Sequence, residues 1–494
     1  MRVGLISTYE LGHQPLHLAS PAALLRAAGH DVIALDVAVD PWRDDLVDEV
    51  DALGFAVPMH TAMRLALELA IRVRARRPDL PIALYGLYAP VSREAPVGRV
   101  ADVVLAGEYE PGLLGWVETL AGRDGQAAEA AARLSTRNGS VPGDISGDPV
   151  RQLGRQRFAV PARDLLPTLN RYASAHIDGD TRVAGYTEAS RGCAHLCRHC
   201  PVPAVYGGAT RVVDRDVVLA DIDQQVAAGA QHLTFGDPDF LNAPKHALAV
   251  ARALHARHPE LTYDVTVKVE HVLRDEQIWQ EFAATGCRFV ISAVELLDDD
   301  ILALLDKGHT AAQAAAAVGV LRRAGIEPRP SLLPFTPWSS VGTIARVFDF
   351  VVDHDLVGTV DPVHLSIRLL IPTGSLMLEL DELTPLLEGY DDAALTWRWR
   401  AADPAVDALQ ERLAKIAADA ADTGAPRRST FVAMRAEVLA ALGTADPARV
   451  AEQDVPEDLV DGPGLSEPWF CCAEPTDGQL DVVRTCEGAR TGGG

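Results

Sequence analysis

Short apolar runs alternate with amphipathic segments over the first 123 residues of the chain. The apolar runs lie at residues 3–6, 32–35, 52–57, 82–84 and 103–105, and helical patterns occupy residues 21–28 and 61–74. Buried strands that alternate with helical stretches of about 10–15 residues predict a parallel sheet with helices on both faces. Residues 1–123 are therefore expected to form a doubly wound α/β domain, which binds ligands at the carboxyl ends of its strands.

The same alternation returns between residues 181 and 400. Strand patterns occur at residues 184–189, 231–235, 264–270, 289–295, around Arg329 and at 365–375. Repeated strand-then-helix units predict a partial (β/α)6 barrel, with its chemistry at the carboxyl ends of the strands. We expect residues 124–180 to be a linker and docking segment, 401–455 a helical region and 456–494 a cysteine-containing tail.

Composition narrows the function. At 494 residues the chain is long enough for two or three domains, and its net charge of −24 would repel phosphate backbones, so nucleic acid is not an expected partner. No 18-residue apolar stretch and no signal-peptide pattern appear, which predicts a cytoplasmic protein without a membrane partner. Its seven cysteines do not suggest a disulfide framework.

Three cysteines are grouped as Cys193-x3-Cys197-x2-Cys200. Three thiolates within eight residues can face one point on a short loop, which suits an iron–sulfur cube whose fourth iron stays open. The alternative is a zinc knuckle with His195 or His199 as the fourth ligand. A strand pattern before the loop, and alternating strands and helices after it, favour the cluster.

This spacing resembles the signature of the radical S-adenosylmethionine (radical SAM) superfamily. The resemblance implies a 4Fe–4S cluster whose open iron binds the amino and carboxylate groups of SAM. It further implies an electron from a flavodoxin- or ferredoxin-type reductant, which cleaves SAM to a 5′-deoxyadenosyl radical.

Three further residues are candidate SAM ligands. By position, the resemblance implies that Asp237 accepts the amino group of SAM and that Glu295 approaches its ribose or methionine part. The alternative for Asp237 is a cap in a Gly-Asp-Pro-Asp turn. Arg368 lies among apolar residues and needs an anionic partner, either the SAM carboxylate or a structural salt bridge.

Residues 1–123 resemble the cobalamin-binding domain of the B12-dependent branch of this superfamily, most clearly at residues 101–110. The Asp-x-His-x-x-Gly pattern that supplies an axial histidine is absent, and Glu10-Leu11-Gly12-His13 stands in its place. His13 and His60, at two strand ends, are candidate cofactor-binding residues or ordinary buried histidines. Two interpretations stay open: cobalamin bound without that ligand, or a domain that kept the fold without the cofactor.

The tail carries the sequence Cys471-Cys472-Ala473-Glu474-Pro475, followed by Cys486. It resembles a radical SAM group named for a Cys/Sec-Cys-Ala-Glu-Pro tail, in which some members have selenocysteine. A position that accepts selenium suggests a nucleophilic or redox-active group, so Cys471, Cys472 and Cys486 are candidate catalytic residues. The alternative is a terminal tail with incidental thiols.

Three functions follow from these features. The first is a radical SAM enzyme that modifies a small molecule, by methylation through cobalamin or by another carbon transfer, with help from the tail thiols. The second forms a carbon bond to sulfur, selenium or a metalloid, using the 3-amino-3-carboxypropyl group of SAM. The third is a non-catalytic iron–sulfur or corrinoid binding protein.

Overall fold

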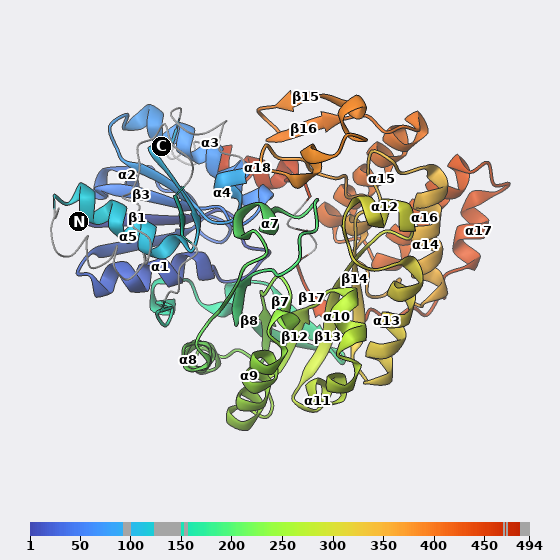
Figure 1. Ribbon diagram of the computed structural model, residues 1–494, viewed down its shortest axis with the longest axis horizontal. Helices are drawn as coiled ribbons and strands as arrows, with labels where there is room; N and C mark the ends of the chain where they lie inside the picture. The colour runs from blue at the N-terminus through green and yellow to red at the C-terminus, as the bar shows by residue number, and fades with distance from the viewer. Residues whose placement is uncertain (92–99, 123–149, 153–156, 468–469, 471–472, 485–494) are drawn as a thin grey trace, which may run out of the picture.

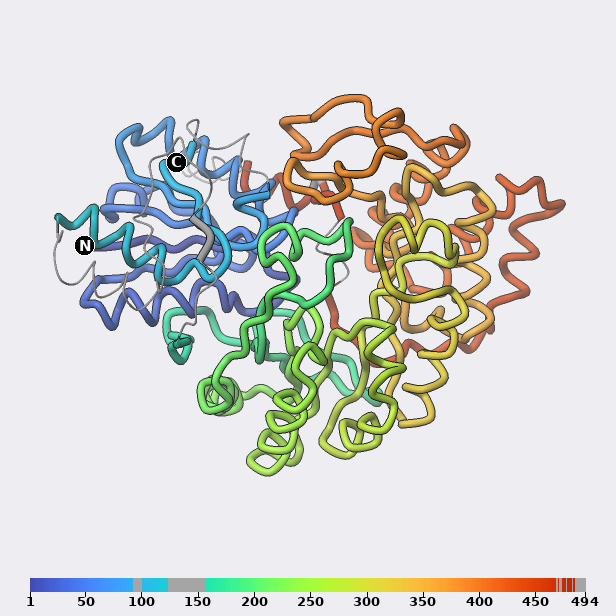
Figure 2. Tube along the Cα trace, viewed as in Figure 1, coloured from blue at the N-terminus to red at the C-terminus, as the bar shows by residue number. Residues whose placement is uncertain are grey.

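The computed structural model describes residues 1–91, 100–122, 150–152, 157–467, 470 and 473–484 (Figure 1). The amino-terminal domain lies beside a curled sheet with helices on its outer side, and the carboxyl-terminal helices cover the far edge of that sheet (Figures 1 and 2). The α/β architecture predicted from the sequence is confirmed.

The amino-terminal domain is a six-stranded parallel sheet in the order β2-β1-β3-β4-β5-β6. Separate apolar clusters fill its two faces, as expected for strands that are buried on both sides. The last strand comes from the segment predicted to be linker. The strands are β1 Arg2–Ser7, β2 Asp31–Asp36, β3 Ala52–Ala56, β4 Ile82–Tyr85, β5 Val103–Gly107 and β6 Val150–Gln152, and the helices are α1 Leu16–Ala27, α2 Leu46–Glu49, α3 His60–Arg76, α4 Tyr88–Val91 and α5 Tyr109–Leu120.

The second sheet has seven strands in the order β14-β13-β12-β11-β8-β7-β17. Its five strands from β8 to β14 run parallel, and helices alternate with them along the chain. The strands are β7 Ser174–Ile177, β8 Asp180–Thr187, β11 His232–Phe235, β12 Thr262–Thr266, β13 Cys287–Glu295 and β14 Glu327–Leu332. The helices are α8 Arg215–Ala227, α9 Pro244–Arg257, α10 Val269–Arg274, α11 Trp279–Ala284, α12 Asp299–Leu304, α13 Ala311–Arg323 and α14 Val341–Asp353. A short antiparallel pair, β9 Ser190–Gly192 and β10 Thr210–Val212, flanks helix α7 Pro201–Tyr206.

Two sequence predictions for this sheet are wrong. A sixth strand at residues 365–375 does not form, and only one bridge, between Phe335 and Arg368, joins that segment to its neighbour. The third strand was expected to reach residue 270, but β12 ends at Thr266 and α10 begins at Val269.

The carboxyl-terminal region packs on the barrel and then returns to the first domain. Hairpin β15 Leu387–Asp391 and β16 Thr396–Trp399 is followed by α15 Pro404–Thr423, α16 Arg427–Ala441 and α17 Pro447–Gln453. Strand β17 Gly464–Leu465 pairs with β7, and helix α18 Asp477–Arg484 lies against α3 (Figure 1). Among the described residues, no helix is both long enough and apolar enough to cross a membrane.

Candidate active site

The three clustered cysteines lie on the loop between β9 and α7, at the carboxyl end of the barrel strand β8. Cys193 and Cys197 are buried, Cys200 is partly exposed, and none of the three forms a disulfide. Gly192 enters this loop with φ +72°, and a Cβ there would lie 2.3 Å from the carbonyl oxygen of Ala209. The glycine is therefore required by a left-handed backbone and a close approach, immediately before the first cysteine.

Neighbouring barrel units hold the loop in place. The amide of Ala194 donates to Asn242 Oδ1 at 3.2 Å, and the amide of Arg198 donates to the Leu305 carbonyl at 3.0 Å. The ammonium of Lys307 is buried beside the loop, where it interacts electrostatically with Cys197 and Cys200. Three reduced thiols on one anchored loop, with a buried cation to balance thiolate charge, fit the donor set of an iron–sulfur cluster.

A cavity of about 380 Å³ opens beside Cys200 at the carboxyl ends of the barrel strands. Four parts of the chain contribute to its wall: the first domain, the cysteine loop, the barrel strands and the tail. Representative lining residues are Leu11, His13, Tyr88, Tyr186, His199, Cys200, Asp237, Phe289, Glu295, Arg329, Ser331, His364, Glu467 and Phe470. This is where a ligand can meet the cysteine loop and the first domain together.

Glu295 lies at the end of β13, in the wall of this cavity. Its Oε1 accepts a hydrogen bond from Lys307 Nζ at 2.8 Å and lies 3.1 Å from His199 Nε2. Burial raises the pKa of Glu295, but Lys307 and His199 lower it by more, so the carboxylate stays charged. Its φ of +66° coincides with a register shift between β13 and β14. Such strain at a strand end is typical of functional sites.

Asp237 also lies in the wall of the cavity, directly after β11. Its two oxygens accept hydrogen bonds from the Ala189 amide at 2.9 Å and the Ser190 hydroxyl at 2.6 Å. Burial raises the pKa of Asp237 to about 7, although the Ser190 hydrogen bond opposes this. Asp237 therefore positions the strand that leads into the cysteine loop, and its role toward SAM stays a prediction.

Arg368 has a protein partner. One guanidinium nitrogen donates to Asp407 Oδ1 at 2.6 Å, another donates to the Trp399 carbonyl, and the guanidinium lies 3.5 Å from the centre of the Trp399 ring. Of the two alternatives raised by the sequence, this geometry satisfies the salt bridge. Arg368 still borders the cavity, and a role in binding SAM is untested.

A buried charge network joins the first domain to the cysteine loop. Arg191 donates to Glu188 at 2.7 Å and to Glu110 at 2.6 Å, and it lies 3.3 Å from Glu108. Burial raises the pKa of Glu108 to about 7, while Arg191 opposes and Glu110 reinforces that change. One cation therefore faces three carboxyl groups, two residues before Cys193.

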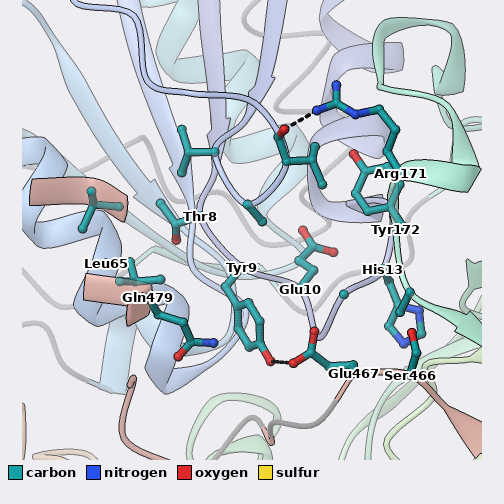
Figure 3. Close-up of a pocket in the computed structure, with 16 residues that line it drawn as sticks. Thr8, Tyr9, Glu10, His13, Leu65, Arg171, Tyr172, Ser466, Glu467 and Gln479 are labelled. Carbon is teal, nitrogen blue, oxygen red and sulfur yellow. Dashed lines mark hydrogen bonds between the residues drawn. The ribbon is translucent and has the colours of Figure 1, made fainter. Parts of the chain in front are cut away.

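A second cavity, of about 400 Å³, lies at the ends of β1 and β2 in the first domain (Figure 3). His13 and Glu467 line both cavities, so the two adjoin. His13 is buried against the Tyr186 ring at 4.8 Å, and burial lowers its pKa to about 4, which leaves a neutral imidazole.

Glu10 shows how this cavity could accept a polar cofactor. Its Oε1 is buried and makes no hydrogen bond among the described residues. Burial, followed by the charges of Asp36 and Glu188, raises the pKa of Glu10 well above its usual range. A protonated carboxyl group can both donate and accept hydrogen bonds, which suits the amide-rich rim of a corrinoid. The residues thus fit cobalamin held by its periphery.

His60 faces the tail. Its Nε2 lies 3.2 Å from Glu474 Oε1, the same carboxylate pairs with Arg64, and the Thr61 hydroxyl donates to the Ala473 carbonyl at 3.0 Å. The Ala-Glu-Pro part of the tail motif, residues 473–475, therefore packs against the start of α3. His60 lines neither of the two adjoining cavities. Cys471, Cys472 and Cys486 lie outside the described residues.

Comparison with protein families decides what this arrangement is. The model of the radical SAM superfamily matches residues 187–349, and the model of the B12-binding domain matches residues 2–113. The chain belongs to the radical SAM superfamily. It joins a radical SAM domain to an amino-terminal B12-binding domain, and the predicted 4Fe–4S cluster and SAM are the cofactors that these domains imply. The likeness to radical SAM enzymes favours catalysis over the hypothesis of a non-catalytic binding protein.

Individual relatives support the same grouping. The hopanoid C-3 methylase of Methylococcus capsulatus is 24% identical over 332 residues, which cover 66% of this chain and 62% of the relative. This radical SAM chain thus spans about 62% of the length of that curated relative.

Two solved structures share the fold. The cobalamin-dependent SAM radical enzyme OxsB, with aqua-cobalamin and SAM bound, has a TM-score of 0.65 at 15% identity, covering 92% of this chain and 70% of OxsB. The radical SAM methyltransferase TsrM from Kitasatospora setae, with tryptophan and a SAM analogue bound, has a TM-score of 0.57 at 18% identity, covering 72% and 71% of the two chains.

Sequence reasoning missed how several residues contribute to the site, and it considered His199 only as an alternative zinc ligand. Lys307 reaches the cysteine loop through its ion pair with Glu295, His199 of the loop contacts the same carboxylate, and Arg191 pairs with Glu110 across the domain interface. A lysine twelve residues after a strand-end glutamate gives no periodic signal. The sequence analysis used the Glu-Tyr-Glu segment at residues 108–110 only for its resemblance to the cobalamin-binding domain. Its two acidic side chains also mark a position that needs a cation.

Proposed function

We propose that this radical SAM enzyme transfers a methyl group, or another carbon fragment, to a small molecule with the help of cobalamin. The supporting observation is the cavity of about 380 Å³, which borders the cysteine loop and the strand ends of the B12-binding domain at once. A substrate in that cavity lies next to both cofactor sites without any domain rearrangement.

The residues of the chain have distinct roles in this proposal. Cys193, Cys197 and Cys200 hold the cluster, which when bound supplies the electron that cleaves SAM. Lys307 balances the charge of Glu295 and of the thiolates, and it orients Glu295 toward the cavity. Asp237 orders Ala189 and Ser190 at the start of the loop. We propose Glu295 and Asp237 as the residues nearest to bound SAM.

The cavity wall indicates the substrate class. Aromatic and aliphatic side chains form much of it, and a few polar groups converge there, including Arg329, Ser331 and Asp361. Arg329 donates to Asp361 at 2.7 Å and is buried. A volume of about 380 Å³ with sparse polar groups suits a compact, partly apolar small molecule.

The tail cysteines are proposed to act on this substrate or on its product. Phe470, which precedes them, lines the cavity, and its ring lies 4.3 Å from that of His364. Ala473, which follows them, is buried, and its amide donates to the Phe470 carbonyl at 3.1 Å. Of the two residues that flank Cys471 and Cys472, Phe470 therefore stands in the cavity wall, and Ala473 is joined to it by a backbone hydrogen bond.

The test is nucleoside analysis by mass spectrometry after the anaerobically reconstituted enzyme reacts with SAM and a reductant. The proposal expects 5′-deoxyadenosine together with S-adenosylhomocysteine, and faster turnover with cobalamin and a flavodoxin- or ferredoxin-type electron donor. If 5′-methylthioadenosine is instead the main product above the chemical background, the aminocarboxypropyl group leaves SAM, and the methylation proposal is wrong.

Two variants separate the parts of the proposal. Cys197→Ala should lose the cluster and every SAM-derived nucleoside, whereas a Cys471→Ser/Cys472→Ser double variant should keep iron and SAM cleavage but lose substrate turnover. Full turnover by the double variant would show that the tail thiols are incidental.

A further inference from the structure

A group of metal-binding side chains lies beneath the cysteine loop, outside the cavity. His195 belongs to the loop itself, Asp239 follows β11, and His271 lies on α10 after β12. One ligand atom from each lies within 4.8 Å of the others. The three residues thus come from three successive barrel units and meet at one point, and none of them lines the cavity of about 380 Å³.

The distances suit a single small cation. His195 Nε2 lies 3.1 Å from His271 Nε2 and 3.8 Å from Asp239 Oδ2, and His271 Nδ1 lies 2.7 Å from Asp239 Oδ2. Zinc bonds of about 2.1 Å place tetrahedral ligands about 3.4 Å apart. One imidazole offers only one nitrogen to a given ion, so His271 would bind through Nε2, which faces His195, while its Nδ1 keeps the contact with Asp239. The ion would then lie between the two Nε2 atoms, and a rotation of the Asp239 carboxylate would bring Oδ2 into its coordination sphere.

Two of the atoms lack a hydrogen bond. Asp239 Oδ2 and His271 Nδ1 are buried, and neither makes a hydrogen bond to any described residue, although they lie close together. Asp239 is completely buried. Asp239 Oδ2 is thus held mainly by its ion pair with His271 Nδ1, and a metal ion would give this buried oxygen the second partner that a carboxylate oxygen can accept.

The surrounding groups already orient these ligands. Asp239 Oδ1 accepts from the Leu241 amide at 2.9 Å, which leaves Oδ2 to face the histidines. His195 Nδ1 lies 3.8 Å from Glu270 Oε2. A carboxylate on the outer nitrogen of a histidine is the usual arrangement around a metal-bound imidazole, because it fixes the ring and its tautomer.

We propose that His195, Asp239 and His271 bind one divalent transition-metal ion, Zn²⁺ or Fe²⁺, separate from the iron–sulfur cluster. Two neutral imidazoles and one carboxylate suit either ion. When the metal binds between the two Nε2 atoms, the proton that lies there moves to His195 Nδ1, which faces Glu270, so both imidazoles stay neutral; a water completes the coordination. The ion fastens the cysteine loop to the second and third barrel units, so its role is structural.

The test measures metal content in the reconstituted holoenzyme. After equilibration with buffered Zn²⁺, we expect about one zinc per chain beyond the cluster iron, with nitrogen and oxygen ligands in zinc X-ray absorption spectra. Asp239→Asn and His271→Gln should each weaken zinc binding more than about 10-fold, because loss of even an outer-shell partner costs that much. For the second metal, holoenzyme with a natural-abundance cluster is loaded with ⁵⁷Fe²⁺, whose Mössbauer spectrum separates a ferrous ion with nitrogen and oxygen ligands from the cluster irons.

His232→Gln is the matched control. His232 is a buried histidine on β11 that pairs with Asp264 at 2.9 Å, so its loss should perturb the barrel without affecting metal binding. Three results would overturn the proposal: no extra metal in the wild-type enzyme, sulfur ligands around the zinc, or equal zinc binding by Asp239→Asn. In each case the three residues form only a hydrogen-bonded contact under the loop.

Discussion

At the scale of single residues, the site depends on buried charges whose partners are few. Glu295 and Lys307 are both buried, and each is the main counter-charge of the other. Removing one member of a buried pair leaves the other uncompensated, and this costs about 3–5 kcal/mol. The pair therefore combines a large contribution to stability with a position beside the cysteines.

Lys307→Met should lower the free energy of unfolding by about 3–5 kcal/mol in anaerobic denaturant titrations. It should also slow 5′-deoxyadenosine formation, because Glu295 loses the ammonium that orients it. Lys307→Arg keeps the charge and should retain more of both properties. Equal stability of the wild type and the methionine variant would contradict the importance of this pair.

Glu108 gives a pH-dependent prediction. Its folded-state pKa is raised from 4.5 to about 7, so the folded protein keeps a proton that the unfolded chain releases. The stabilisation from this proton is fully present below about pH 4.5 and is lost as the pH rises to about 7. Between pH 5.5 and 7.5, wild-type stability should fall by about 2 kcal/mol more than that of Glu108→Gln.

Thermal unfolding of both proteins across this pH range provides the measurement. If the pH profiles of the wild type and Glu108→Gln were parallel, Glu108 would carry no extra proton in the folded protein. Arg191 would then neutralise all three carboxyl groups around it, those of Glu108, Glu110 and Glu188.

At the scale of elements, the strand-to-loop junctions decide the geometry. The cysteine spacing predicted the loop correctly, and most strands of both sheets were located from apolar runs. One of the two errors lies where polar residues at a strand end imitate strand alternation. Lys268 and Glu270 continue the period of β12, but the chain turns into α10 there, because the following residues pack as a helix.

Gly192→Ala tests the junction before Cys193. The new methyl group would lie 2.3 Å from the Ala209 carbonyl oxygen at a φ of +72°, so β9 and β10 must separate. We expect less iron per chain after reconstitution and a clearly lower Tm. Gly207→Ala is the matched control, because its φ is +56° and a Cβ there meets nothing within 4 Å. Its cost should be only the backbone strain, about 1–2 kcal/mol.

At the scale of the whole molecule, the two domains are joined by buried polar contacts. Arg163 donates to both oxygens of Asp221 at 2.9 Å, to the Tyr186 carbonyl at 2.6 Å and to Gln14 Oε1 at 3.2 Å. The sequence predicted a docking segment here, but not this side chain. Long-range pairing of this kind leaves no local pattern, which is why the fold was easier to predict than the site.

Arg163→Met should destabilise the protein by about 3–5 kcal/mol, because Asp221 is buried and would lose its cation. Arg26→Met is the control: Arg26 pairs with Asp164 in the same segment, with side chains 45% and 63% exposed. That change should cost no more than about 1 kcal/mol. Denaturant unfolding of the two variants gives the comparison, and similar losses would mean that burial of the pair adds nothing.

The return of the tail to the first domain has a consequence for the order of biosynthesis. Tyr9 donates to Glu467, 458 positions later, and His60 meets Glu474, 414 positions later. A nascent first domain can fold while the ribosome is still translating the barrel. During that interval the tail residues that line the cavity of the first domain have not yet been synthesised. A large cofactor can therefore enter the cavity from the side that the tail later covers. Emergence of the tail then adds Ser466, Glu467, Gln479 and Val483 to the cavity wall.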